Sequence, residues 1–344
     1  MVSSRMATES NLPRRFVVTG ASGFIGGHLA ARLAEAGASG CLLSRKQPTD
    51  VPAGFGWQDW QACRATRLEG AGPEACVIHL ATVHHVERPD TAALAAFDEV
   101  NVHGTRQLLA DCSSAGIRRF IFFSSIKAAS PASGAAAQTE ADRANERPNS
   151  DYGRSKLAAE QCVREWAAAD ANRSALIVRP AVVYGPGNTA NLFALVDAIA
   201  RGRFFLAGSN DNIKSLVAVR NVVAAVEHLA AQMQPGVELL YLVDRESFSV
   251  REIAGMVARA LGRSDRLTAL PVPLLRCGAA MGDAVERLTG RKFPLTSQRL
   301  VALLETTHFS SAKLASTGFA HPVETEAGLA EMVAWYRAAG RRGS

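Results

Sequence analysis

Short apolar segments and longer helical patterns alternate along the first half of the chain. The apolar segments are rich in β-branched and aromatic residues and lie at residues 16–19, 41–44, 76–80, 119–123 and 174–178. Between them, apolar residues recur at helical spacing, around residues 28–36, 91–115 and 151–166. Segment 119–123 is the most apolar, as expected for a parallel strand covered on both faces. The alternation predicts an α/β fold with a doubly wound, mainly parallel sheet of the Rossmann type.

The pattern changes after residue 186, where helical segments dominate. Helices are predicted around residues 192–201, 222–231, 250–261, 273–288 and 325–337, with short strands at 215–219 and 239–243. We expect a Rossmann domain at residues 12–185 and a smaller, mostly helical substrate lobe at residues 186–340. A segment near 215–232 is expected to return to the Rossmann core. Residues 47–72 and 130–150 are predicted as irregular, the second as a loop that covers a site.

Three glycines follow the first predicted strand at a spacing of three. This strand–turn–helix arrangement places a dinucleotide pyrophosphate at a helix N-terminus, where backbone N–H groups are unpaired. The predicted cofactor contacts in the turn and first helical residues are Gly20, Ser22, Gly23, Phe24, Ile25 and Gly26. Ala81 and Thr82 end the third strand, and small residues there would let a cofactor pass close to the backbone. Leu80 and Ala81 are therefore predicted contacts as well.

The end of the second predicted strand bears on the choice between NAD and NADP. The chain reads Ser44-Arg45-Lys46 there, and no acid follows until Asp50. An acid would bind the ribose 2′-hydroxyl of NAD, whereas an arginine accommodates the 2′-phosphate of NADP. Arg45 therefore favours NADP, the alternative being that it stacks on adenine or faces water.

A tyrosine and a lysine four residues apart begin the helix after the long loop. Tyr152 and Lys156 share one helical face, and Ser125 ends the most apolar strand, where sites open in such sheets. A free tyrosine has a pKa of about 10, and a nearby ammonium favours its phenolate. Lys156 would also hold the nicotinamide ribose, and Ser125 would hydrogen-bond the reacting oxygen. The set suits hydride transfer coupled to proton transfer at a sugar or alcohol carbon.

Composition narrows the class of protein. The 344 residues are 48% hydrophobic and 20% charged with a net charge of +6, which describes a soluble globular protein. The basic residues are dispersed, which argues against nucleic-acid binding. Six cysteines form no CxxC pair, and no apolar run reaches the length of a membrane span. His84 and His85 lack a third ligand at metal-site spacing, so no metal site is predicted. We expect a cytoplasmic enzyme without a signal peptide.

These motifs together resemble the extended short-chain dehydrogenase/reductases, and within them the NAD-dependent epimerase/dehydratase group that acts on nucleotide sugars. The resembling stretches are Thr19-Gly20-Ala21-Ser22-Gly23-Phe24-Ile25-Gly26, His79-Leu80-Ala81, Asn101 with Gly104-Thr105, Phe123-Ser124-Ser125-Ile126-Lys127, Tyr152-Gly153-Arg154-Ser155-Lys156, Arg179-Pro180 with Tyr184-Gly185-Pro186-Gly187, Phe309-Ser310-Ser311-Ala312-Lys313-Leu314, and Gly328-Leu329.

The resemblance implies a role for each motif. Ser125, Tyr152 and Lys156 would be catalytic, with Tyr152 and Lys156 also contacting the cofactor, Ser124 would lie beside the nicotinamide, and Asn101 would be structural. The implied substrate contacts are His84, Lys127, Tyr184, Asn188, Asn191 and Lys214. Lys214 stands where the epimerases often carry an arginine, and lysine lacks the bidentate fork.

The same catalytic set serves two reactions within the resembling group. A C4 epimerase of a UDP-hexose or UDP-N-acetylhexosamine, with NAD, would pass through a transient 4-keto sugar. A reductase of a 4-keto nucleotide sugar would use NADPH once, and Arg45 favours it. Ile126 and Lys127 follow Ser125 where 4,6-dehydratases carry an Asp-Glu pair, which argues against dehydration. The intact catalytic set also argues against a non-catalytic NADP-sensing module.

The helix predicted at 273–288 bears on partners. Its apolar residues are Leu274, Leu275, Met281, Val285 and Leu288. Such a helix could contact a membrane if the sugar were carried on a lipid. Because it lacks a cationic face, we predict instead a core helix or a helix of a homodimer interface.

Overall fold

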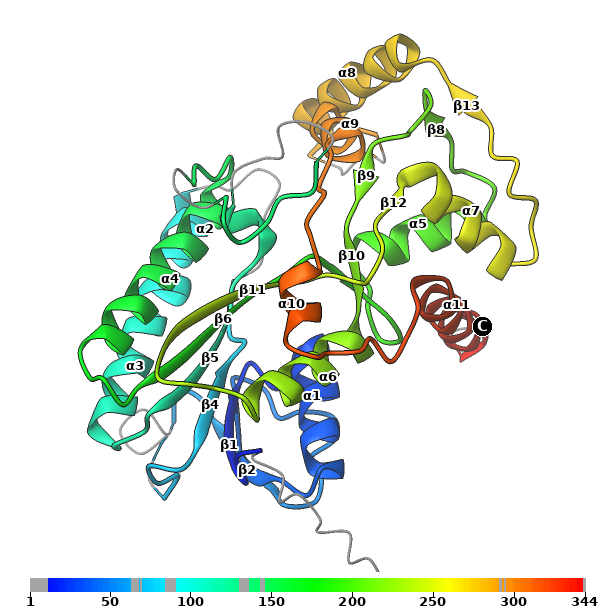
Figure 1. The fold of residues 1–344 in the computed structure, drawn as a ribbon. Coiled ribbons are helices and arrows are strands. Elements are labelled where there is room, and N and C mark those ends of the chain that lie inside the picture. Colours follow the sequence, from blue (N-terminus) through cyan, green and yellow to red (C-terminus); the bar gives the residue numbers. More distant parts are fainter. Residues whose placement is uncertain are drawn as a thin grey trace, which may run out of the picture.

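The computed structural model describes residues 12–62, 68, 70–83, 91–129, 136–142, 146–290, 293 and 295–342. A seven-stranded sheet lies at its centre, with every neighbouring pair parallel and the strand order β11-β6-β5-β4-β1-β2-β3 (Figure 1). The strands of this sheet are β1 (Arg15–Thr19), β2 (Ser39–Ser44), β3 (Phe55–Asp59), β4 (Cys76–His79), β5 (Arg119–Phe123), β6 (Ser174–Pro180) and β11 (Gly236–Leu242).

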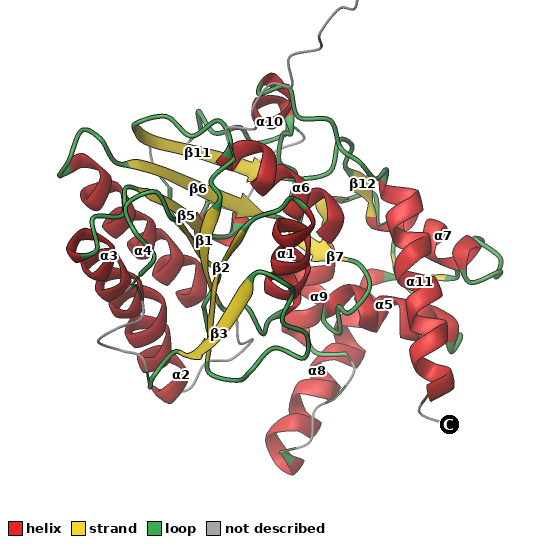
Figure 2. Ribbon diagram, turned by 90° about the horizontal axis from the view of Figure 1, so that it is seen from below, coloured by secondary structure: helices red, strands yellow, loops and turns green. Residues whose placement is uncertain are grey.

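Helices cover both faces of this sheet, as Figure 2 shows. Alternate residues of each strand point to opposite faces. On β1, Phe16 and Val18 join the core under α1 (Phe24–Glu35) and α6 (Val219–Ala230), whereas Val17 joins the core under α3 (Gly104–Ser114) and α4 (Asp151–Ala168). The predicted doubly wound Rossmann fold is confirmed, and burial on both faces explains the near-continuous apolar strands.

The order of the strands reverses direction between β1 and β4. From β1 the chain proceeds outward through β2 and β3, and from β4 it proceeds the other way through β5, β6 and β11. In open parallel sheets, ligands bind in the crevice outside the carboxyl ends of the strands at such a reversal. This position therefore places the glycine turn after β1 and the loop after β4 at one site.

A smaller, mostly helical region lies beside the carboxyl ends of the sheet (Figure 1). One of its cores joins α5 (Asn191–Ala200), α7 (Val250–Ala260) and α11 (Thr325–Arg342). A second, smaller core joins α8 (Val272–Thr289) and α9 (Ser297–Leu304). Strands of two or three residues form three further pairs: β10 (Leu216–Ala218) with β7 (Val182–Tyr184), β12 (Phe248–Ser249) with β9 (Ile213–Lys214), and β13 (Ala269–Leu270) with β8 (Leu206–Ala207). The remaining helices are α2 (Thr91–Ala96), η1 (Phe97–His103), η2 (Ile126–Ala128) and α10 (Ala312–Ser316).

Two local predictions are corrected. Residues 47–72 contain strand β3, whose five residues are preceded by prolines and glycine and so lack a clear strand signal. As an edge strand β3 pairs only with β2 and buries only Phe55 fully, so it needs little apolar sequence. The helix predicted at 91–115 contains a π-helical turn, η1, where the N–H of Gly104 bonds the carbonyl of Glu99 five residues earlier. The turn places Asn101 inside the protein.

His79, at the end of β4, links the sheet to α3. Its Nδ1 lies 2.6 Å from Thr19 Oγ1 and its Nε2 lies 3.0 Å from Thr105 Oγ1. Because the Thr105 hydroxyl donates to the carbonyl of Asn101, Nε2 donates to Thr105, and Nδ1 accepts from Thr19. Both ring nitrogens of a neutral imidazole are therefore satisfied. Burial, and then the charge of Lys156, lower the pKa of His79 to about 3.

We expect the free energy of unfolding to fall as the pH is lowered from about 6.5 toward 3, by up to about 1.4 kcal/mol per pH unit from His79. In this window the unfolded chain binds a proton that the native His79 does not. Urea unfolding at a series of pH values measures the slope. His79→Gln should unfold more readily at pH 7 but show a shallower acid slope, and an unchanged slope would contradict the assignment.

Candidate active site

The glycine turn after β1 forms a close cradle at the start of α1. The N–H of Gly23 donates to the carbonyl of Gly20 at 3.0 Å, and no side chain caps the helix N-terminus that begins at Phe24. A Cβ on Gly26 would lie 2.5 Å from the Gly20 carbonyl oxygen, so only glycine lets the helix approach the turn this closely. Uncapped N–H groups and a positive helix dipole suit a pyrophosphate. The cradle therefore fits a dinucleotide.

Replacing Gly26 by alanine should weaken dinucleotide binding by about 5-fold to 150-fold, because overpacking against backbone costs about 1–3 kcal/mol and the turn must shift. The neighbouring Gly27 offers a matched control, since nothing lies within 4 Å of a Cβ placed there. Fluorescence titration of NADH and NADPH measures both variants. Equal affinities for Gly26→Ala and Gly27→Ala would show that the cradle does not hold the cofactor.

Ser125 and Tyr152, predicted as catalytic from segments 27 residues apart, are brought together here. The side chains of Ser125 and Thr82 lie near the Tyr152 hydroxyl and favour its phenolate form. Ser150 caps α4 by accepting from the N–H of Gly153 at 3.1 Å. A Cβ on Gly153 would lie 2.1 Å from the Lys127 carbonyl oxygen, so this glycine allows the first turn of α4 to pack against η2. That close packing sets Tyr152 beside Ser125.

Lys156 lies one helical turn further along α4, on the same face as Tyr152. Its side chain is 1% exposed, and its Nζ lies 4.4 Å from the centre of the Phe122 ring. Burial lowers the pKa of Lys156 to about 7, while the carboxylate of Glu160 opposes that shift. Burial also raises the pKa of Tyr152 to about 12, and the side chains of Thr82 and Ser125 act the other way. Tyr152 is therefore a neutral hydrogen-bonding acid at pH 7 until a positive charge stabilises its phenolate.

Asn101 holds the loop after β4 in place. Its Oδ1 accepts from Thr82 Oγ1 at 2.9 Å and from the N–H of Val83 at 2.8 Å, and its Nδ2 donates to Ser155 Oγ at 3.0 Å. The expectation that Asn101 is structural is confirmed. Sequence reasoning did not single out Thr82 as a partner of Tyr152. The position of Thr82 just after β4, where the strand order reverses, could have indicated that it lies in the site.

A buried ion network lies beside the residues predicted to be catalytic. Arg179, at the end of β6, is fully buried and donates to Glu160 Oε1 and Oε2, both at 2.7 Å, and to Glu146. Ser124 donates its hydroxyl to Glu160 Oε1. The network thus connects α4, the end of β6 and the residue preceding Ser125. Sequence reasoning missed Glu160, although it lies four residues after Lys156 and so shares its helical face.

The two lysines predicted to contact substrate lie close to each other. Lys127 Nζ is 3.0 Å from Glu305 Oε2, and Lys214 Nζ donates to the carbonyl of Ala302 at 2.8 Å. Burial lowers the pKa of Lys214 to about 8, with Glu305 raising it and Lys127 lowering it further. Lys127 therefore binds Glu305 directly after α9, and Lys214 binds the backbone of the last turn of α9.

The other predicted binding residues differ in how much surface they offer. Arg45 is exposed directly after β2. Asn191 is exposed as the first residue of α5. The Asn188 side chain donates to the Val183 carbonyl at 2.8 Å and accepts from the N–H of Ala190 at 2.7 Å, so it shapes its own loop. His84 lies outside the described residues.

The prediction that Tyr184 contacts substrate is corrected. Tyr184 is fully buried in the core of the helical region. Its hydroxyl donates to Asp244 Oδ2 at 2.9 Å and lies 3.2 Å from the Thr325 carbonyl oxygen. With no exposed surface and a hydroxyl held inside the protein, Tyr184 connects β7 to the start of α11.

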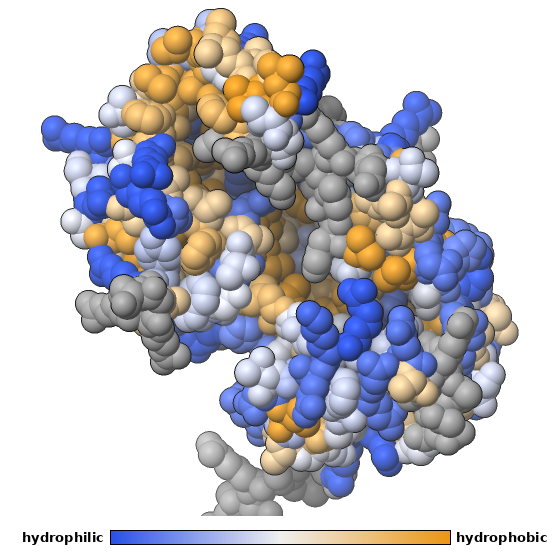
Figure 3. Space-filling view, turned by 180° about the vertical axis from the view of Figure 1, so that it is seen from behind, coloured by the Kyte–Doolittle hydropathy of each residue, from blue (hydrophilic) through white to orange (hydrophobic). Residues whose placement is uncertain are grey.

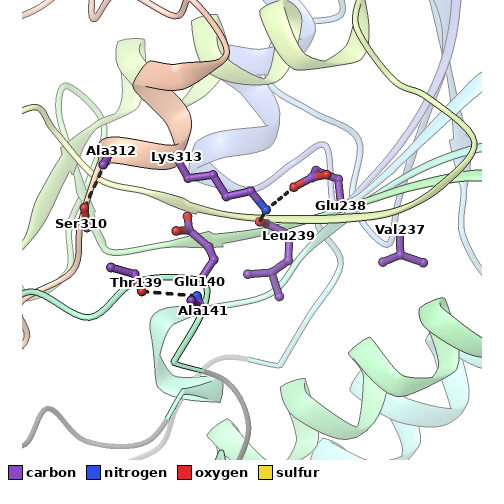
Figure 4. A pocket seen from close by; sticks show the side chains of 9 residues that line it. All are labelled: Thr139, Glu140, Ala141, Val237, Glu238, Leu239, Ser310, Ala312 and Lys313. Carbon is purple, nitrogen blue, oxygen red and sulfur yellow. Dashed lines mark hydrogen bonds and ion pairs between the residues drawn. The ribbon is translucent and has the colours of Figure 1, made fainter.

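A groove of about 530 Å³ lies at the outer edge of the sheet, and neither Ser125, Tyr152 nor Lys156 lines it (Figure 4). Glu140 accepts from the N–H of Tyr241 at 2.8 Å, and Lys313 Nζ donates to the carbonyl of Leu239 at 2.9 Å. These two side chains form hydrogen bonds with backbone groups on the unpaired edge of β11. We therefore interpret the groove as a covered strand edge, at which another strand cannot pair. In the part of the chain that the structure describes, no helix is long and apolar enough to cross a membrane.

Comparisons with known proteins agree with this geometry. The family model described as "NAD dependent epimerase/dehydratase family" matches residues 16–240. An N-acetyl-alpha-D-glucosaminyl-diphospho-ditrans,octacis-undecaprenol 4-epimerase of Escherichia coli O157:H7 is 30% identical over 91% of this chain and 92% of its own. A ceramide reductase of Caulobacter vibrioides is 30% identical over 94% of each chain. The solved structure of MoeE5 with UDP-glucose and NAD is 25% identical, covers 94% of this chain and 99% of its own, and gives a TM-score of 0.72.

Proposed function

Since the chain belongs to the NAD-dependent epimerase/dehydratase family and is an NAD(P)-dependent enzyme of the extended short-chain dehydrogenase/reductase type, we propose that it inverts C4 of a hexose or N-acetylhexosamine carried on a diphosphate. The observation that carries the proposal is the placement of Tyr152 beside Ser125, with Lys156 buried one helical turn away. The Escherichia coli relative is named as a 4-epimerase of a sugar that is linked through a diphosphate.

The chain's own residues divide the work of the proton transfer. Tyr152 takes the proton of the C4 hydroxyl and later returns it, while Ser125 holds the same oxygen by a hydrogen bond. Lys156 supplies the positive charge that favours the phenolate. Gly20, Gly23 and Gly26 form the cradle for the dinucleotide, and Ser124 lies beside the catalytic serine. When bound, the nicotinamide supplies the acceptor and donor of the C4 hydrogen.

We place the diphosphate of the substrate beside two lysines near Ser125. Lys127 follows Ser125 by two residues, and Lys214 approaches from β9. In the proposed complex the diphosphate replaces Glu305 as the counter-ion of Lys127 and also binds Lys214. A lysine ammonium acts as a point charge, so it can bind a diphosphate without the bidentate hydrogen bonds that an arginine would form.

A second candidate, reduction of a 4-keto sugar, is favoured by one observation. Arg45 is exposed at the end of β2, where an arginine suits the 2′-phosphate of NADP. One relative that is 30% identical to this chain is named as a reductase, the ceramide reductase of Caulobacter vibrioides. The two candidates differ in whether the cofactor is regenerated within each turnover.

Identification of the nucleotide retained by the purified protein separates the two candidates. C4 epimerisation of UDP-N-acetylglucosamine or of N-acetylglucosaminyl diphosphate on a short prenyl chain, with NAD and no net change at 340 nm, would support the proposal. Stoichiometric NADPH oxidation by a 4-keto sugar diphosphate, with no epimerisation of the alcohol, would overturn it. Ser125→Ala serves as the matched control, since it should lower either activity while leaving cofactor binding intact.

A further inference from the structure

Helix α8 exposes an apolar stripe along its length. Leu274 is 59% exposed, Met281 70%, Val285 39% and Leu288 87%. Their spacings of seven, four and three residues place them on one face of the helix, over about 21 Å from first to last. Figure 3 shows hydrophobic side chains gathered at the end of the molecule that carries α8 and α9. Of the two alternatives expected for this segment, a core helix does not account for the exposed stripe, and a homodimer interface stays a prediction.

The opposite face of α8 packs on α9 and the segment before it. Ala279 and Leu300 are buried against each other's helices, and a Cβ on Gly282 would lie 2.0 Å from the Leu295 carbonyl oxygen. The two helices therefore form one unit, here called the α8–α9 unit (Val272–Thr289 and Ser297–Leu304).

The far end of the α8–α9 unit reaches the catalytic site. Glu305, directly after α9, binds Lys127, which lies two residues after Ser125. Asn149, one residue before the cap of α4, also donates to Glu305 at 3.3 Å. The exposed apolar stripe thus belongs to a structure whose other end contacts the residues around the catalytic serine and the proposed diphosphate position.

We propose that the stripe Leu274, Met281, Val285 and Leu288 docks on a lipid bilayer surface and that the sugar diphosphate is attached to a membrane-anchored polyprenol-type lipid. This inference rests on the proposed function. A substrate of this kind keeps its tail in the bilayer while its diphosphate lies at the surface. The α8–α9 unit would place that diphosphate beside Lys127 and Lys214 while the stripe contacts the acyl chains.

Three observations favour a bilayer over a second protein chain. The stripe consists of aliphatic and methionine side chains and lacks the Trp, Tyr and Arg residues that dominate protein interfaces. The names of both sequence relatives reported above contain a lipid, undecaprenol in one and ceramide in the other. The net charge of +6 suits an anionic surface.

Flotation with vesicles of phosphatidylethanolamine and phosphatidylglycerol tests the docking surface. The unmodified protein should float with the vesicles, and M281E/L288E should bind them about tenfold more weakly or worse. Val237→Glu is the matched control, because Val237 is 40% exposed on β11, outside the stripe. Equal thermal unfolding temperatures would show that both variants are folded. Equal flotation of all three proteins, or of none, would overturn the docking surface.

Activity measurements separate this inference from the proposed function. M281E/L288E should lose about tenfold or more of kcat/KM on N-acetylglucosaminyl diphosphate linked to a long polyprenol in vesicles, but keep it on a short-chain, water-soluble analogue. Epimerisation of the soluble analogue without vesicle binding would overturn the docking surface and leave the function standing. Vesicle binding without epimerisation of either substrate would overturn the function alone. Conversion of a dimer to a monomer by M281E/L288E, without vesicle binding, would assign the stripe to a second copy.

Discussion

Replacing Tyr152 by phenylalanine should lower kcat by about 10²-fold to 10⁴-fold while leaving cofactor affinity within about twofold of the original. The substitution removes only the hydroxyl that lies beside Ser125 and Thr82. The ring itself is buried beside Phe97, and a phenylalanine fills the same space. Steady-state kinetics with the sugar diphosphate, together with fluorescence titration of the cofactor, measure the two quantities separately.

The same substitution at Tyr336 provides the control. Tyr336 donates its hydroxyl to Asp197 Oδ1 at 2.8 Å, outside the candidate site. Tyr336→Phe should therefore keep the original kcat within about twofold. Retention of activity in Tyr152→Phe would mean that another group moves the proton, and the assignment of the catalytic base would fall. An equal loss in both variants would point to lost stability instead of lost chemistry.

The proximity of Ser125 and Tyr152 could be predicted from the sequence because topology alone brings these two residues together. Ser125 ends a central strand and Tyr152 starts the next helix, and in a parallel sheet both positions lie at the same edge. The glycine turn was recognisable for the same reason, since the spacing of its glycines reflects backbone contacts that hold in any such turn. Residues whose role follows from strand order and helix period could thus be placed without coordinates.

Other features depend on which side of an element faces the protein, and the sequence does not specify this. Tyr184 follows a strand end in the expected loop, yet its ring turns into the core and its hydroxyl to Asp244. The apolar residues of α8 were expected to lie in the core or in a homodimer interface, and the face of the helix that is buried within the chain carries Ala279 and Gly282. In both cases a long-range packing partner decides the outcome.

Replacing Glu160 by glutamine should lower the free energy of unfolding by about 3 kcal/mol, the lower end of the range for breaking a buried ion pair. Glu160 is fully buried, and Arg179 donates to both of its oxygens at 2.7 Å. The substitution leaves the buried guanidinium with only Glu146 as a counter-ion. Although burial raises the pKa of Glu160, the hydrogen bonds and charge of Arg179, with Ser124 and Arg164, hold it below its usual 4.5. The stabilisation is therefore present above about pH 4.5 and lost as the pH falls through the lower native pKa.

Removal of Arg164 is the matched control, because it binds the same carboxylate from a more exposed side. Arg164 Nη2 lies 3.0 Å from Glu160 Oε2, and its side chain is 25% exposed, so Arg164→Met should cost about 1 kcal/mol or less. Urea unfolding of both variants at pH 7 measures the difference, and equal losses would contradict a special role of the buried pair.

Glu160 should also affect catalysis through Lys156, and a pH profile distinguishes this from lost stability. The Glu160 carboxylate raises the pKa of Lys156 against the effect of burial. Without that charge the ammonium loses its proton at lower pH, so the alkaline limb of kcat in Glu160→Gln should move to lower pH. Arg164→Met retains the carboxylate and should keep the limb in place. A stability loss with an unshifted profile would make Glu160 a structural residue only. A shifted profile would show that the network behind the sheet sets the charge beside Tyr152.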